Sequence, residues 1–173
     1  MAPHIPDSID EKLLGLYLSD HLTGATAGAS RIGRMAEAFS DTPVAKELAE
    51  LSADIRQERD MLRGLIHDLD VHQRPHRQAA AWLVERAGRL KLNGRIVKRS
   101  PMTMVLEAEL MRAATLGKLG GWQTLEELAP ALGLDPARFA ALGDEARSQI
   151  DLLSRVHEHA RRNAFRKRGD ITT

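Results

Sequence analysis

Apolar residues recur every three or four positions along several long segments of the chain, which is the period of an α-helix with one buried face. The long segments are residues 9–39, 43–69, 101–129 and 136–167, and a shorter one covers residues 79–91. The pattern predicts a single all-α domain, residues 1–173, with four long helices and one short helix.

Capping residues and prolines mark the expected helix starts. Ser8 and Glu11 have the spacing of a capping box, in which each side chain satisfies a backbone N–H of the first turn. Three later starts place a capping residue directly before proline, which loses no hydrogen bond at the first helical position. These pairs are Thr42-Pro43, Ser100-Pro101 and Asp135-Pro136.

Glycines indicate where helices end or pack closely. Asn93-Gly94 ends the short helix, and Gly120-Gly121 is expected to interrupt the third long helix. In the first long helix, Gly24, Gly28 and Gly33 predict the close approach of a neighbouring helix, because glycine in a helix interior costs about 1 kcal/mol that packing has to offset.

The links between the segments predict how the helices are connected. The first two long helices, and likewise the last two, are joined by only a few residues, so each pair has to pack antiparallel. About 30 residues separate the two pairs, enough to travel the length of a bundle. The expected fold is an antiparallel four-helix bundle with a long crossover that contains the helix at 79–91.

Composition narrows the class further. Hydrophobic residues make up 43% of the chain and charged residues 28%, as in globular proteins. The chain has no cysteine, which excludes disulfides, thiolate metal ligands and thiol catalysis. The N-terminal residues have no signal-peptide pattern, and no apolar run approaches the roughly 18 residues of a membrane span, so we expect a cytoplasmic protein without a membrane partner.

The lengths and order of the helices, together with the long crossover, resemble the ferritin-like fold. That resemblance implies iron storage or oxidation at a di-iron centre inside the bundle, where two helices carry Glu-x-x-His. None of the seven histidines follows an acidic residue by three positions, so that motif is absent from this sequence.

Four polar residues interrupt the apolar stripes and are the candidate site. His21 and Glu58 are expected to face each other in the first hairpin, and Glu109 and His157 in the second. Because buried charges are usually paired, these residues can form two Glu–His hydrogen-bonded pairs. Alternatively, all four can ligate a divalent metal (Fe, Mn or Zn), since imidazole and carboxylate suit these ions.

The net charge of +1 hides an uneven distribution. Residues 86–99 contain six Lys or Arg residues and no acid, and a second basic stretch covers residues 161–168. These stretches are either solvated helix faces or contacts to nucleic acid.

Three functions therefore remain open. The first is a non-catalytic binding or structural bundle that forms homo-oligomers. The second is a metal-dependent oxidase that uses His21, Glu58, Glu109 and His157. The third is a nucleic-acid-associated bundle that uses the basic stretches.

Overall fold

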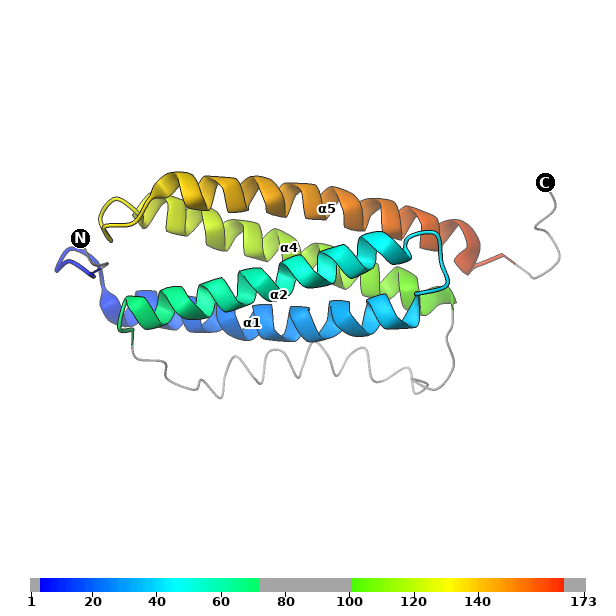
Figure 1. Cartoon of the computed structure of the whole chain (residues 1–173), viewed down its shortest axis with the longest axis horizontal. Helices are drawn as coiled ribbons and strands as arrows, with labels where there is room; N and C mark the ends of the chain where they lie inside the picture. The colour runs from blue at the N-terminus through cyan, green and yellow to red at the C-terminus, as the bar shows by residue number, and fades with distance from the viewer. Residues whose placement is uncertain (1–3, 72–100, 167–173) are drawn as a thin grey trace.

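The computed structural model describes residues 4–71 and 101–166, in which four helices pack together (Figure 1). They are α1 (Glu11–Ala38), α2 (Ala45–Asp68), α4 (Pro101–Leu128) and α5 (Pro136–Ala164). These two ranges contain no strand, so the predicted all-α class is confirmed for them. The short helix predicted at 79–91 lies outside the described residues. None of the described helices is long and apolar enough to cross a membrane.

The first two helices begin slightly later than the sequence predicts. Asp10, not Ser8, caps α1, and its Oδ1 accepts a hydrogen bond of 2.9 Å from the backbone N–H of Leu13. Thr42 does not cap α2. Its hydroxyl instead donates to the carbonyl oxygen of Phe39, directly after α1, and so closes the turn between the two helices.

The last two helices begin where the proline pairs predict. In α5, Oδ1 of Asp135 accepts a hydrogen bond of 2.9 Å from the backbone N–H of Ala137. The link before it contains Gly133 at a φ of 69°, a left-handed conformation that glycine adopts without a steric penalty. The sequence therefore identifies this short turn correctly.

The predicted interruption at Gly120 and Gly121 is wrong, because α4 runs through both residues without a break. The predicted role of Gly24 and Gly28 is also wrong, since a Cβ built on either would meet no atom within 4 Å. The close approach occurs instead at Gly121, whose added Cβ would lie 2.9 Å from the His21 ring. Tertiary packing thus explains Gly121, although the low helix propensity of glycine predicts a break there.

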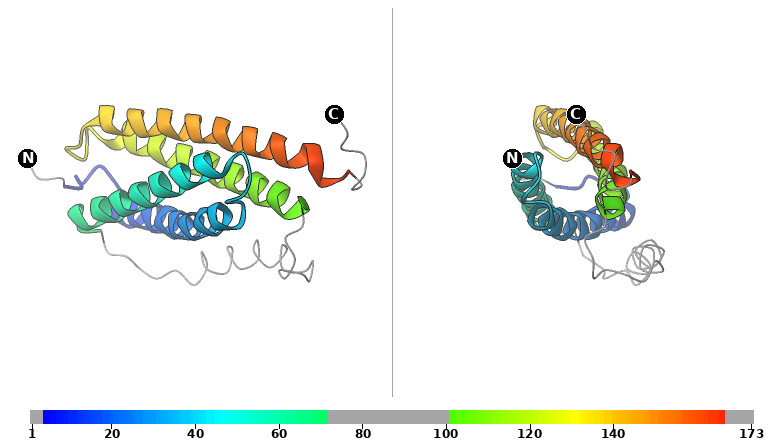
Figure 2. Two further views of the ribbon diagram at one scale, coloured as in Figure 1. Left: turned by 45° about the vertical axis from the view of Figure 1, so that its right-hand side comes forward. Right: turned by 90° about the vertical axis from the view of Figure 1, so that its right-hand side faces the viewer.

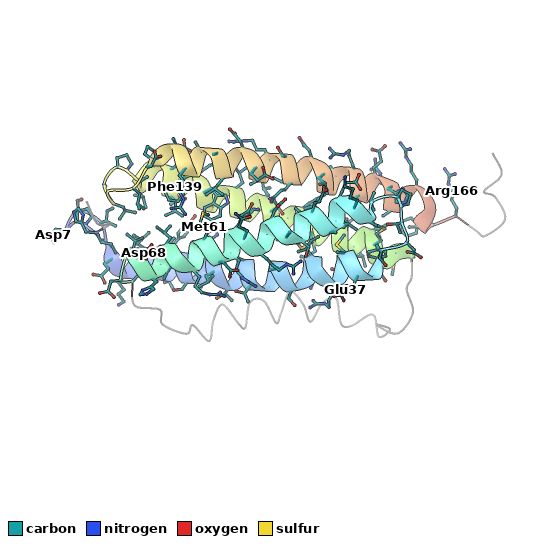
Figure 3. The ribbon with its side chains drawn as sticks, in the orientation of Figure 1. Asp7, Glu37, Met61, Asp68, Phe139 and Arg166 are labelled. Atoms are coloured by element: carbon teal, nitrogen blue, oxygen red, sulfur yellow. The ribbon has the colours of Figure 1, made fainter. Side chains whose placement is uncertain are left out.

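The four helices form an arc in which each packs on its neighbour. α1 contacts both α2 and α4, and α5 packs most extensively on α4, an order that the end-on view in Figure 2 also shows. Asp7, Asp68 and Phe139 lie near one end of the bundle, and Glu37 and Arg166 lie near the other (Figure 3).

The core is divided into two apolar clusters along the length of the bundle. The Phe39 cluster includes Ile32, Phe39, Leu48, Ile55, Met111 and Leu153. The Trp122 cluster includes Leu14, Leu18, Leu62, Trp122, Phe139 and Ala146. Every described helix contributes buried residues to both clusters, so each cluster holds one half of the bundle together.

The inward face of α4 differs from the predicted one. The sequence pattern predicts that Glu109 points inward, but its side chain is half exposed, and Leu116, two turns further along the same stripe, is 61% exposed. The buried face carries Met104, Val105, Ala108, Met111, Thr115 and Trp122. Small and apolar residues occur all around α4, so the period of 3.6 residues alone does not select the inward face.

Candidate functional site

A buried polar layer lies between the two apolar clusters, and we define it as Glu58, Lys118 and Gln149. Glu58 of α2 stands one turn after Ile55 of the Phe39 cluster and one turn before Leu62 of the Trp122 cluster. Gln149 of α5 likewise separates Ala146 from Leu153. The layer therefore occupies the middle of the bundle, where metal-binding helical bundles place their ligands.

Its three side chains form a closed set of hydrogen bonds. The amide Nε2 of Gln149 donates to Oε1 of Glu58 over 2.8 Å. The Lys118 ammonium donates to the other carboxylate oxygen, Oε2, and to the amide oxygen of Gln149. Both oxygens of Glu58 are thus used, and the ion pair has no net charge. A buried carboxylate is tolerated only with such compensation.

The lysine titrates differently from a lysine on the surface. Burial lowers the pKa of Lys118, because desolvation disfavours the charged ammonium. The Glu58 carboxylate opposes this shift most strongly, and Glu145 and Asp54 add weaker opposition. Three carboxylates around one ammonium favour its charged form, so the electrostatics suit an internal ion pair.

His21 does not join the polar layer. The predicted His21–Glu58 pair is wrong, because the hydrogen-bond partners of Glu58 are Lys118 and Gln149. His21 lies instead at the contact between α1 and α4. Its ring centroid is 4.5 Å from that of Tyr17, and its Cε1 and Nδ1 face the backbone of Gly121. Burial lowers the pKa of His21, and the neighbouring Asp20 carboxylate opposes the shift.

The second predicted pair is present but lies toward the outside. Nε2 of His157 is 3.1 Å from Oε1 of Glu109, so the prediction that these residues meet is confirmed. The Glu109 side chain is half exposed, which corrects the prediction that it points into the bundle, while most of the His157 side chain is covered. The pair therefore joins α4 to α5 at the edge of the core.

The four predicted ligands thus fall into three separate places. In residues 4–71 and 101–166, no three His, Cys, Asp or Glu side chains come together as a group that could hold a metal ion. Zinc sites in proteins use three or four such ligands. Metal binding by His21, Glu58, Glu109 and His157 stays a prediction, and the polar layer is the better-defined candidate site.

Sequence reasoning missed Lys118 and Gln149, the two partners of Glu58. For Gln149 a signal existed, because it lies three residues after Ala146 and four before Leu153. That spacing fits a buried stripe as well as the position of the neighbouring Ile150 does. Lys118 carried no such signal, because a lone lysine in a helix normally faces solvent.

Comparisons with known proteins identify no relative: no protein family, no curated protein and no solved structure matches this chain. The candidate site is therefore interpreted from its own geometry.

Proposed function

We propose that the protein is a non-catalytic bundle of ferritin-like architecture, with two antiparallel hairpins joined by a long crossover through residues 72–100. In this proposal it acts as a binding or structural protein and forms homo-oligomers. The observation that supports the proposal is the polar layer, in which the chain supplies its own cation to a buried carboxylate.

The polar layer differs from a di-iron centre in what binds its carboxylate. In a di-iron bundle, carboxylates and histidines from four helices surround metal ions. Here the Lys118 ammonium and the Gln149 amide already bind both oxygens of Glu58. A metal ion at Glu58 would have to displace the ammonium and leave it buried without a partner, which is energetically costly. The arrangement favours a structural role for Glu58.

Metal analysis of the untreated protein tests this proposal. We expect wild-type protein purified without chelator to contain Fe, Mn and Zn well below one ion per chain, and to oxidise Fe(II) no faster than buffer alone. Near-stoichiometric metal that is lost in Glu58→Gln or His21→Gln would instead establish the metal-dependent alternative. Arg138→Gln, an exposed substitution far from all four predicted ligands in the sequence, is the matched control. Light scattering measures the proposed oligomeric state, and a monomeric mass would contradict it.

The distribution of charge supports a second candidate, association with nucleic acid. The described residues 4–71 and 101–166 hold 22 acidic and 15 Lys or Arg residues, whereas residues 72–100 hold eight Lys or Arg residues and one acid. The described residues are therefore acidic on balance, and the excess positive charge lies outside them. Lysine and arginine bind phosphates with an affinity that falls steeply as salt rises.

A gel-shift titration separates this candidate from the first. If it holds, the protein shifts short DNA or RNA at low salt, and the combined change Arg95→Gln, Lys98→Gln and Arg99→Gln weakens the shift. The control removes the same charge outside both basic stretches, at the exposed residues Lys12, Lys46 and Arg138, and should weaken the shift less. The absence of any shift at low salt excludes nucleic-acid association.

A further inference from the structure

The contact between α1 and α4 joins the first helix pair to the second, and polar side chains hold it at two places. Toward one end, the Tyr17 hydroxyl and the Thr124 hydroxyl are 3.0 Å apart. Toward the other end, Nη1 of Arg31 lies 2.7 Å from Oε2 of Glu107. Separating α1 from α4 would separate the two hairpins along this side of the bundle.

His21 lies at the first of these places, one turn after Tyr17. Its imidazole rests against the buried backbone of Gly121, so closely that a Cβ at that position would be 2.9 Å from the ring. A helix backbone has its carbonyl groups engaged in its own hydrogen bonds and offers few free acceptors to a ring pressed against it. No hydrogen bond within the described part of the chain involves the His21 ring, which contacts the Tyr17 ring at an interplanar angle of 59°.

The charged surroundings of His21 are sparse. Asp20, an exposed neighbour on the same helix, is the charged group that affects its titration. α4 presents the Gly121 backbone and the neutral Thr124 hydroxyl, and neither α4 nor α2 contributes a charge that shifts its pKa. Desolvation therefore outweighs the help from Asp20, and the pKa of His21 lies below its usual value of 6.5.

We propose that His21 makes the contact between the two hairpins pH-sensitive, so that protonation of its ring loosens α1 from α4. His21 is partly buried, its ring lies against the Gly121 backbone, and no described side chain accepts a hydrogen bond from it. Burial therefore disfavours the imidazolium, and moving α1 outward returns the ring fully to water. Mild acid thus opens the contact between α1 and α4.

The direction of the effect follows from linkage. Well above pH 6.5, His21 is neutral in both the closed and the opened forms, and the contact keeps its full stability. As the pH falls below 6.5, the opened form binds the proton first, because its ring is in water. Stability of the contact is then lost progressively until the pH passes below the pKa of the closed form.

Trp122 provides the readout, since it is 3% exposed and directly follows Gly121. In a Trp82→Phe background, which leaves Trp122 as the one tryptophan, we expect its fluorescence to shift to longer wavelength between about pH 7.5 and about pH 5. His21→Gln should remove this transition, and His157→Gln should leave it in place. Asp20→Asn should move its midpoint to lower pH, because the carboxylate that favours the imidazolium is gone.

Two outcomes would overturn the proposal. The first is a His21→Gln variant whose Trp122 emission changes with pH as in the parent protein. The second is an unchanged midpoint of the pH transition in Asp20→Asn, an exposed substitution that should not affect folding. Circular dichroism at about pH 7.5 shows whether His21→Gln is folded, and if it is not, the Asp20→Asn midpoint decides the question.

Discussion

Glu58 of α2 and Gln149 of α5 are joined by a 2.8 Å hydrogen bond, although 91 positions separate them in the sequence. Their helices pack mainly on α1 and α4 respectively, and the bond spans the side of the bundle where the backbones approach least. Lys118 of α4 completes the link from a third helix. Long polar side chains therefore connect both hairpins at mid-length, where a shift of one residue along any of the helices would break the set.

Removing the lysine should destabilise the fold strongly. Lys118→Met leaves Glu58 buried without its counter-ion, and breaking a buried pair in this way typically costs about 3–5 kcal/mol. Urea unfolding followed by circular dichroism measures the loss in the free energy of unfolding. A loss below about 1 kcal/mol, the usual range of surface pairs, would show that the pair is not buried in solution.

Changing both partners should restore most of this stability. In the double variant Glu58→Gln with Lys118→Met no charge remains, and Gln149 can still hydrogen-bond the new amide, so we expect a free energy of unfolding much closer to wild type. The double-mutant cycle gives the coupling energy directly. If the double variant loses as much stability as the two single variants together, Glu58 and Lys118 do not interact.

Two glycines of α4 should respond in opposite directions to alanine. Gly121→Ala places a methyl group 2.9 Å from the His21 ring, which should cost about 1–3 kcal/mol through overpacking. Gly117→Ala is the matched control, because its methyl group meets open space and should stabilise the helix by about 0.5–1 kcal/mol. Thermal unfolding measures both changes. A His21→Ala background should reduce the cost of Gly121→Ala, and an equal cost there would contradict the proposed contact.

The Arg31–Glu107 pair should contribute modestly and in a salt-dependent way. Both side chains are partly covered, and Nη1 of Arg31 donates to both carboxylate oxygens. Glu107→Gln should lower the free energy of unfolding by up to about 1 kcal/mol at low salt and by less at high salt. Glu50→Gln, which removes the exposed Lys46–Glu50 pair, should have no measurable effect at either salt concentration. Equal effects of the two variants would show that the Arg31–Glu107 pair does not contribute to the free energy of unfolding.

Substitutions at Gly133, in the turn between α4 and α5, should differ in how much they destabilise the protein. Its positive φ of 69° is unfavourable for residues with a Cβ, so Gly133→Ala should destabilise the protein by about 1–2 kcal/mol. Gly133→Asn should cost less, because asparagine tolerates the left-handed conformation. Thermal unfolding of the two variants measures the difference, and equal losses would indicate a cause other than backbone conformation.

The helices and the short turn before α5 were predictable because their causes are local. Apolar spacing of three and four residues and proline at the first position of α4 and α5 act within a few residues of chain. The Glu109–His157 pair was also predictable, because a short link sets the level of two helices in a hairpin. The inward face of α4 was not predictable, because its small and apolar residues cover several faces and leave its rotation undetermined by pattern. The predicted break at Gly120 and Gly121 failed for another reason, since Gly121 packs against His21 of a distant helix.

By itself, the sequence determined the all-α class, the four described helices and the presence of polar residues in otherwise apolar stripes. Only the tertiary structure decided that Glu58 meets Lys118 and Gln149, and that His21 meets Gly121. The physical reason is the sequence separation over which each interaction acts. Backbone hydrogen bonds and caps depend on residues a few positions away. The partner of a long buried side chain depends on the rotation and axial shift of helices that are distant in the chain, which no local pattern specifies.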